Sequence, residues 1–337
     1  MVSKRFVAKR LLLLGPVLFG VATVVFSILH LSPGDPAATI AGERANKAYV
    51  AQVRANLGLD DPLWEQYVRF LRDTATLDFG QSYQIQRGTP VSSILVDRLP
   101  ITIELAILGQ IAGLLFGLPL GILSAVRKDT FTDHFTRVGA LAGISVPIYW
   151  SGPLLILLFA QVIGVLPTSG RISSSYFVDS VTGLILVDTL LEGDPAAFES
   201  AARHLLMPVV VLGVYSMAFV SRMMRSSMLE VIRQDYMRTA RAKGQGARIT
   251  VMKHGLRNAF IPVITIIGIQ FGSLLGGSVL TETVFEINGI GTLLVAAIGR
   301  SDYPVVQATV LVFAFLYTLV NLFVDITYSV LDPRIEQ

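Results

Sequence analysis

The stretch Leu11–Leu31 reads LLLLGPVLFGVATVVFSILHL and contains no Asp, Glu, Lys or Arg. A helix of about 20 apolar residues crosses the hydrocarbon layer of a membrane, which is about 30 Å thick. Lys4, Arg5, Lys9 and Arg10 precede it. A basic start is also typical of cleaved signal peptides, but their apolar part is only about 7–15 residues long. The sequence therefore predicts an uncleaved membrane span.

The composition agrees with a membrane protein. Of the 337 residues, 53% are hydrophobic and 15% are charged, and the mean hydropathy is +0.63. Soluble domains carry about 25% charged residues, so an ordinary soluble enzyme, a disordered chain and a secreted disulfide scaffold are excluded. The sequence has no Cys, and its four His residues lie far apart. We therefore predict no disulfide, no thiolate nucleophile and no metal site.

Six apolar segments predict an all-α integral membrane protein with six transmembrane helices. Pro147 and Pro153 interrupt the third segment and predict a kinked helix inside a bundle. The fourth segment is the shortest. The six segments are Leu11–Leu31, Leu99–Val126, Val138–Leu166, Leu205–Val220, Ala259–Leu280 and Val305–Val330.

Basic residues indicate how these spans are oriented. With the N-terminus inside, the cytoplasmic segments hold 17 of the 27 Lys and Arg residues. Cytoplasmic loops carry the excess of basic residues, so we predict a multi-pass protein of the cell membrane with both termini in the cytoplasm. The chain then divides into residues 1–31 with the first span, an external region 32–98, a core 99–330 that contains the cytoplasmic segment 221–258, and a cytoplasmic tail 331–337.

The external region 32–98 contains its own short helices. Ser32-Pro33-Gly34-Asp35-Pro36 ends the first helix. Apolar residues at helical spacing then predict two amphipathic helices, followed by a turn region at Asp78-Phe79-Gly80. Two interpretations stay open, a cap on the bundle and a wall of the entrance for a substrate. The helices are marked by Val50, Val53 and Leu57, and by Trp64, Tyr67, Val68 and Leu71.

Two spans carry glycines four residues apart, which places each set on one helical face. This spacing predicts close approach of helix backbones, and it would also permit the helices to slide. The glycines are Gly109, Gly113, Gly117 and Gly121 in the second span, and Gly268, Gly272 and Gly276 in the fifth.

The cytoplasmic segment Ser221–Asn258 holds nine basic residues against Glu230 and Asp235. Gly244 and Gly246 end a predicted amphipathic helix whose apolar stripe is Met224, Met228, Ile232, Tyr236 and Ala240. Three interpretations compete. The segment fixes topology and contacts anionic lipid, it contacts nucleic acid, which its attachment to a membrane disfavours, or it docks into a groove on a cytoplasmic partner protein.

The stretch Asp235–Gly244, DYMRTARAKG, resembles the EAA loop of ABC importer permeases, in the form found in dipeptide, oligopeptide, glutathione and nickel importers. Arg238 and Thr239 depart from the general loop, whereas Ala240 and Gly244 match it. Other motifs extend the resemblance over nearly the whole chain. They are Leu31–Pro36, Gly58–Pro62, Lys253–Ala259, Ile261-Pro262, Leu275–Ser278, Glu282–Phe285, Gly289–Gly291, Arg300–Pro304 and Leu331–Ile335.

The resemblance implies a type I ABC importer permease fold and a subunit that is not an enzyme. Its partners would be a second, different permease subunit, two cytoplasmic ABC ATPases and an external substrate-binding protein. ATP and Mg would belong to the ATPases, and this chain has no G-x-x-x-x-G-K-[ST] loop of its own. The positions that carry over as ATPase contacts are Asp235, Tyr236, Arg238, Thr239, Ala240, Lys243 and Gly244.

Polar residues within the spans are the candidates for a substrate pathway. Ionisable groups cost about 2.5–3.5 kcal/mol at mid-span. Glu104 and Asp325 lie near span ends, where a structural or interfacial role competes with a functional one. Deeper amides bridge helices or line the pathway, and we expect the span that contains Gln270 to line it. The amides are Gln110, Gln161, Gln270 and Asn321.

Two other classes of protein fit a polytopic chain. An intramembrane hydrolase needs a base at membrane depth, but the His residues lie at span ends or in loops. A secondary transporter typically has inverted repeats and charged midplane sites, and neither is visible. For an importer, the resemblance leaves dipeptides, oligopeptides, glutathione, nickel and sugars open as substrates, with peptides preferred.

Overall fold

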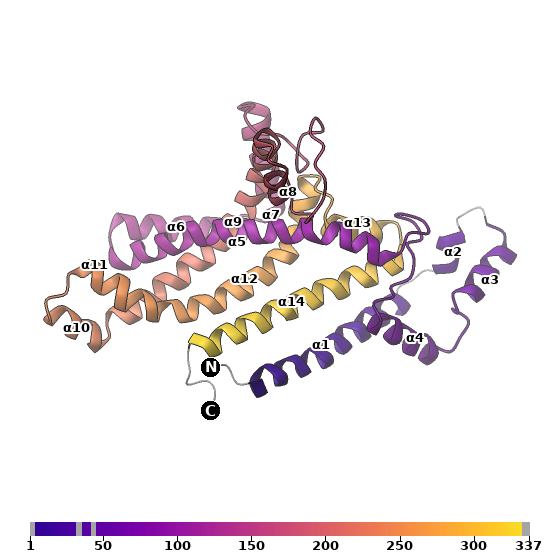
Figure 1. Ribbon diagram of the computed structural model, residues 1–337, viewed down its shortest axis with the longest axis horizontal. Helices are drawn as coiled ribbons and strands as arrows, with labels where there is room; N and C mark the ends of the chain where they lie inside the picture. The colour runs from indigo at the N-terminus through magenta and orange to yellow at the C-terminus, as the bar shows by residue number, and fades with distance from the viewer. Residues whose placement is uncertain (1–3, 32–35, 42–44, 332–337) are drawn as a thin grey trace.

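The computed structural model describes residues 4–31, 36–41 and 45–331, and helices form most of this part of the chain (Figure 1). Within these ranges the only β pairing is a single bridge between Gln81 and Pro90. The all-α prediction is confirmed. Short helices include α2 (Pro36–Ala41), α3 (Lys47–Asn56), α4 (Leu63–Ala75), α8 (Ile185–Glu192) and α13 (Ile290–Gly299).

Five helices are long and apolar enough to cross a membrane, and a bent pair supplies a sixth crossing if it is one span. Each predicted single span lies within one of the five, which extend beyond the predicted bounds. The weakest prediction, Leu205–Val220, is part of a 38-residue helix. The five helices are α1 (Lys4–Leu31), α5 (Val91–Val126), α9 (Pro195–Ile232), α12 (Leu256–Val284) and α14 (Tyr303–Leu331).

The third span differs from its prediction. Instead of one kinked helix over Val138–Leu166, the chain forms α6 (Phe131–Ser145) and α7 (Ile148–Leu155), which continues into the π-helical segment η1 (Ile156–Val162). The two parts meet at 101°. The cause is Pro147, which lacks an N–H and holds the preceding residue in an extended conformation, as the Val146 angles of φ −83° and ψ 117° show. Pro153 lies inside α7 without breaking it.

The pair α5–α9 forms the centre of the bundle, and the first set of glycines lies in its interface. All four glycines are buried. A Cβ atom at Gly109 would come within 2.6 Å of the Leu212 Cβ, and one at Gly121 within 2.6 Å of the Ser221 carbonyl oxygen. These distances are too short for any side chain, so the predicted close packing is what this set of glycines provides.

The second set of glycines only partly follows the prediction. A side chain at Gly268 would collide with Val324, and one at Gly272 would collide with Tyr317, so both positions let α14 pack closely on α12. Gly276 faces open space, with no atom within 4 Å of its added Cβ. Gly276 therefore provides no close helix contact within the described residues of this chain, and its role in packing stays a prediction.

Helix α1 runs beside α14 and carries the external region at one end (Figure 1). Arg10 and Asp325 form an ion pair of 2.7 Å near the other end. The predicted amphipathic helices are α3 and α4, and α4 packs on α1 through Tyr67, whose hydroxyl lies 2.6 Å from the Thr23 hydroxyl. The predicted break at residues 32–35 lies outside the described residues, as does the tail after Leu331.

A loop from the external region is tied to the start of α14 by Asp302, which is fully buried. Its carboxylate accepts hydrogen bonds from the Ser82 hydroxyl at 2.6 Å and from the backbone N–H groups of residues 83–85 at 2.9–3.1 Å. Burial, together with the charge of Asp302, raises the pKa of Tyr83. Asp302 therefore fixes the chain just before α5 onto the bundle.

Candidate functional site

A short helix protrudes from the end of the bundle where α9 stops and α12 begins (Figure 1). After Ile232 the backbone turns at Gln234, whose ψ of 148° is extended, and α10 (Asp235–Ala242) begins. Gly244 then adopts φ +80°, which favours glycine. The chain returns through α11 (Ala247–Ile249) and the π-helical segment η2 (Thr250–Gly255) into α12.

This geometry corrects one sequence prediction. The predicted single helix with the stripe Met224, Met228, Ile232, Tyr236 and Ala240 breaks after Ile232. Met224 and Met228 are fully buried, as expected, but Tyr236 is 42% exposed. The turn at residues 233–234 rotates the following helix, so that Met237, which the prediction missed, faces inward.

Met237 anchors α10 to the bundle. It is the one buried residue of this helix, with 0% exposure. A Cβ added at Gly255 would lie 3.4 Å from the terminal methyl groups of both Met228 and Met237. The side chains of α9 and α10 therefore meet over a glycine of η2, which leaves room for both. The predicted apolar stripe placed Tyr236 on the buried face. The sequence would have revealed this anchor only if the stripe had been shifted by one residue, to Met237.

Hydrogen bonds hold the returning segment in place. The Asn258 side-chain amide donates to the Tyr236 hydroxyl at 2.9 Å. A ring nitrogen of His254 lies 3.0 Å from the side-chain oxygen of Gln245. The Thr250 hydroxyl, which is buried, donates to the carbonyl of Gly246 at 3.1 Å. The segment is therefore a defined structure and not an extended charged loop.

The structure places all the predicted ATPase-contact residues on this protrusion. Apart from the half-buried Ala240, they are exposed. The side chain of Asp235 is 97% exposed and that of Arg238 is 80% exposed, at 3.8 Å from each other. Such an exposed pair contributes little to stability. The α10 surface is therefore free for a partner. The residues are Asp235, Tyr236, Arg238, Thr239, Ala240, Lys243 and Gly244.

A buried ion pair lies at the base of the same end of the bundle. The Arg225 guanidinium of α9 donates from Nε and Nη2 to the two Asp133 carboxylate oxygens of α6, at 2.7 and 2.8 Å. Ser124, near the end of α5, adds a hydroxyl donor at 2.5 Å, and the Asp129 N–H adds another at 3.0 Å. This pair is not predictable from local sequence, because its two members are 92 residues apart. The pair and its Ser124 donor join α5, α6 and α9, and α9 leads directly into α10.

The four predicted pathway amides do not converge on one site. Gln110 is buried and donates to the Ser216 hydroxyl across the α5–α9 interface at 3.1 Å, and its Oε1 has no partner among the described residues. Gln270 is also buried, and its amide nitrogen is likewise unpartnered there. Gln161 is exposed on η1, and Asn321 is half-buried in α14. Gln110 thus bridges helices, and Gln270 remains the pathway candidate.

The acidic residues at the span ends have structural partners. Glu104 is 5% exposed and pairs with Arg171 at 2.6 Å, and it accepts from the Leu186 N–H at 3.0 Å. Asp325 pairs with Arg10, as described above. The prediction missed Glu282, because α12 extends past Leu280. Its carboxylate is fully buried, 2.5 Å from the Thr102 hydroxyl and 3.0 Å from the Thr292 N–H of α13.

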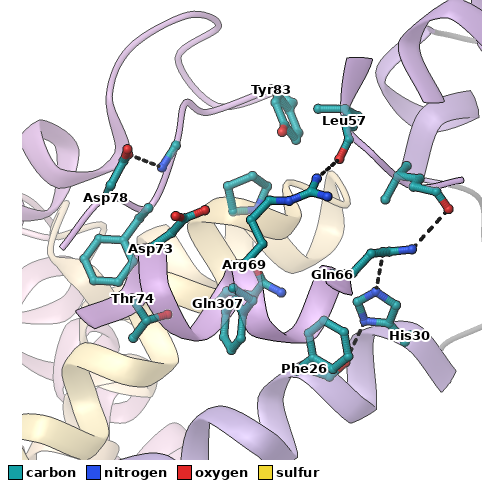
Figure 2. Close-up of a pocket in the computed structure, with 15 residues that line it drawn as sticks. Phe26, His30, Leu57, Gln66, Arg69, Asp73, Thr74, Asp78, Tyr83 and Gln307 are labelled. Atoms are coloured by element: carbon teal, nitrogen blue, oxygen red, sulfur yellow. Dashed lines mark hydrogen bonds between the residues drawn. The ribbon is translucent and has the colours of Figure 1, made fainter. Parts of the chain in front are cut away.

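A cavity of about 240 Å³ lies between α1, α4 and the start of α14, and Figure 2 shows its lining. Two of its polar side chains, Arg69 and His30, have partners within the chain. The Arg69 guanidinium donates to the Leu57 carbonyl and pairs with Asp61. A ring nitrogen of His30 lies 3.1 Å from the Gln66 side-chain oxygen. These internal pairs support the interpretation of the external helices as a cap.

Comparison with known families assigns this bundle to a class. Residues 117–337 match the family described as "Binding-protein-dependent transport system inner membrane component", and residues 3–106 match the N-terminal family of the same systems. The chain belongs to this family. It is a multi-pass membrane permease subunit of a binding-protein-dependent ABC transporter and is not an enzyme. The intramembrane hydrolase and the secondary transporter are thereby set aside.

Individual relatives are similar over almost their full length. The dipeptide transport system permease DppB of Alkalihalophilus pseudofirmus is 44% identical, over 98% of this chain and 99% of the relative. DppB of Escherichia coli K12 is 43% identical over 98% of each chain. The glutathione transport system permease GsiC of Salmonella paratyphi A is 41% identical over 98% of each.

A solved structure shares the fold. The inward-facing MetNI methionine ABC transporter aligns with a TM-score of 0.54 at 19% identity, over 71% of this chain and 97% of that chain. This likeness confirms the predicted type I importer permease fold. The match leaves part of this chain uncovered. That part is similar in size to the predicted first span and external region together, residues 1–98.

Proposed function

We propose that this chain is the first of two different permease subunits of an ATP-driven peptide importer, and that α10 is its contact with an ATPase subunit. Relatives named as dipeptide permeases, at 43–44% identity over the whole chain, support the substrate class. The observation that carries the ATPase contact is the α10 protrusion, which is anchored by Met237 and exposed elsewhere.

The orientation belongs to the same proposal. The protrusion and the α5–α6 turn lie at the end of the bundle that carries the basic segments, and this end faces the cytoplasm. The external region around α2–α4 then faces a substrate-binding protein. ATP and Mg stay on two ATPase subunits, since this chain carries no phosphate-binding loop in its sequence.

Movement of the ATPases would reach the bundle through two buried links. Met237 contacts the region of Gly255 and Met228, so a push on α10 acts on α9 and α12 together. The Asp133–Arg225 pair passes displacement of α9 to α6 and α5. Rigid-body displacement of packed helices is how such transporters alternate access, and Gln270 on α12 is our candidate for a side chain along the pathway.

The test is ATP-dependent uptake by the assembled transporter. The chain is reconstituted in liposomes with its second permease subunit, both ATPases and the binding protein. We expect uptake of a labelled dipeptide that requires ATP and is competed by unlabelled dipeptide. Stronger competition by glutathione would favour the glutathione importer, a second candidate that the 41% identical relative supports. Uptake that follows an ion gradient without ATP would contradict the proposal.

Two glycines supply a matched pair of variants for the ATPase contact. Gly244 has φ +80°, and Gly246 has φ −59° with nothing near its added Cβ. Gly244→Val forces a β-branched residue into the left-handed region, at a cost of about 1–2 kcal/mol, and should distort the end of α10. We expect it to lower dipeptide uptake at least severalfold, while Gly246→Val keeps it near wild type. Equal uptake by the two variants would contradict a role for this turn.

A further inference from the structure

We propose that a pocket between α6 and α9, beside the Asp133–Arg225 pair, binds the phosphate of an anionic phospholipid from the cytoplasmic leaflet. The pocket has a volume of about 310 Å³. Arg137 of α6 and Arg222 of α9 line it, together with the hydroxyl-bearing residues Ser124, Thr136, Ser221 and Ser226. The leaflet assignment rests on the orientation given under the proposed function.

The two arginines that line the pocket, Arg137 and Arg222, lack an acceptor among the described residues. Arg225, which also lines the pocket, donates from Nε and Nη2 to Asp133. Arg137 and Arg222 make no hydrogen bond or ion pair with any residue of the described ranges, and the Ser226 hydroxyl makes no hydrogen bond there either. Two guanidinium groups and a hydroxyl thus face one pocket without an acceptor. Guanidinium groups bind phosphate through paired N–H donors, so an anion with several oxygens fits this donor set.

The pocket lies near the end of the apolar part of the bundle. Gly121 of α5 lies against Ser221 and Met224 of α9, so Arg222 stands close to the end of α5 at Val126. Arg127 and Lys128 follow directly, and the apolar sequence stops there. The pocket is therefore at the level where hydrocarbon gives way to phospholipid headgroups.

Exposed apolar residues lie on the membrane side of the pocket. Leu141 lines the pocket and is 56% exposed. Val138 on α6 and Val214 on α9, two turns from Arg222 toward the membrane centre, are exposed as well. A cationic, hydroxyl-rich end followed by exposed apolar residues matches a phosphate with an attached acyl chain. Free inorganic phosphate shares the phosphate chemistry but would make no use of the apolar part.

The test uses the purified full-length chain and does not depend on ATPase contact or transport. Phosphatidylglycerol retained after delipidation is counted by native mass spectrometry, with phosphatidylcholine and inorganic phosphate as separate arms. The variant R137Q/R222Q removes the two charges without breaking a bond within the described chain. The matched control R127Q/K128Q removes two charges outside the pocket. R137K/R222K keeps both charges and replaces R137Q/R222Q in the comparison if R137Q/R222Q does not fold.

We expect one phosphatidylglycerol per wild-type chain, retained in preference to phosphatidylcholine. Its apparent affinity should fall about tenfold or more in R137Q/R222Q, because each basic residue near an anionic headgroup contributes appreciably to binding. R127Q/K128Q should stay within about threefold of wild type. R137K/R222K keeps the charges but loses the paired guanidinium donors, so its affinity should lie between those of R137Q/R222Q and the wild type. Equal retention by R137Q/R222Q and R127Q/K128Q, no preference over phosphatidylcholine, or binding of inorganic phosphate with no retained lipid would each overturn the proposal. A failure of the ATPase contact would leave these results unchanged.

Discussion

The Asp133–Arg225 pair is a buried ion pair at the basic end of the bundle. Asp133 is fully buried and accepts four hydrogen bonds, two of them from Arg225. Removing one member of a buried ion pair leaves the other charge without compensation, at a cost of about 3–5 kcal/mol. We expect Asp133→Asn to lower the thermal unfolding temperature of the purified chain clearly below that of the wild type.

The control for this variant is Asp129→Asn, four residues away. The Asp129 side chain is 69% exposed, and among the described residues its one ion pair is with Lys128, at 3.3 Å. Exposed pairs of this kind contribute about 0–1 kcal/mol, so the unfolding temperature of the control should stay close to wild type. If Asp133→Asn unfolds at the same temperature as the control, the ion pair does not hold α6 and α9 together.

Met237 offers a second test at the level of one side chain. Truncation of a fully buried Met to Ala costs about 2–5 kcal/mol in a well-packed core. Helix α10 has no other buried residue, so this loss weakens its attachment to the bundle. We therefore expect Met237→Ala to loosen α10 without unfolding the bundle. Limited trypsin cleavage at Arg238, Arg241 or Lys243 should then become faster.

The matched change is Thr239→Ala, on the exposed side of the same helix. Its cleavage rate should remain near that of the wild type. Cleavage of Met237→Ala at the wild-type rate would mean that α10 is held by something other than its contact with Met228 and Gly255.

At this scale the sequence predicts some side chains well and others not at all. The motif Asp235–Gly244 correctly located an exposed helix, because helix-ending glycines and a basic surface are local signals. The partners of Asp133, Glu282 and Asp302 were not predicted. Arg225, Thr102 and Ser82 lie 92, 180 and 220 residues away from these carboxylates, and nothing local distinguishes a buried carboxylate from a solvated one.

Between elements, two glycines on different helices give a direct comparison of packing. A Cβ at Gly121 would come within 2.6 Å of a backbone carbonyl of α9, whereas Gly276 has no atom within 4 Å. Gly121→Ala should destabilise the chain by about 1–3 kcal/mol, because a backbone cannot move aside as a side chain can. Gly276→Ala should be neutral or stabilising by up to about 1 kcal/mol, since Ala favours helix.

Thermal unfolding of the two purified variants checks this difference. Gly276→Ala is the control for the general effect of replacing a helical glycine in a membrane span. Equal unfolding temperatures would contradict the close α5–α9 contact. A loss of stability in Gly276→Ala alone would instead place a tight helix contact where the structure has open space.

Helix type and number follow from hydropathy, but the path of the third span does not. Five predicted spans correspond to single helices of 20–38 residues, and a helix of about 20 apolar residues is long enough to cross a membrane. Pro147 and Pro153 are both compatible with a kink, yet one lies inside α7 and the other marks a turn of 101°. The break of the predicted cytoplasmic helix at residues 233–234 involves neither Gly nor Pro, so no local signal marks it.

For the whole molecule, the account rests on α10 as the point where an ATPase meets the bundle. The natural absence of Cys allows single cysteines to be introduced without further changes. Thr239→Cys puts one on the exposed side of α10, and Phe177→Cys puts one at a position that is 94% exposed in the loop before α8. Both sites are surface positions, and only the first lies on the proposed interface.

The most direct measurement is photo-crosslinking of the assembled transporter from these two positions. With a cysteine-reactive benzophenone, we predict that Thr239→Cys captures the ATPase subunit, that the yield changes when ATP is added, and that Phe177→Cys captures no ATPase. Capture of the ATPase from Phe177→Cys, or from neither position in a transporter that is active before photolysis, would contradict the account.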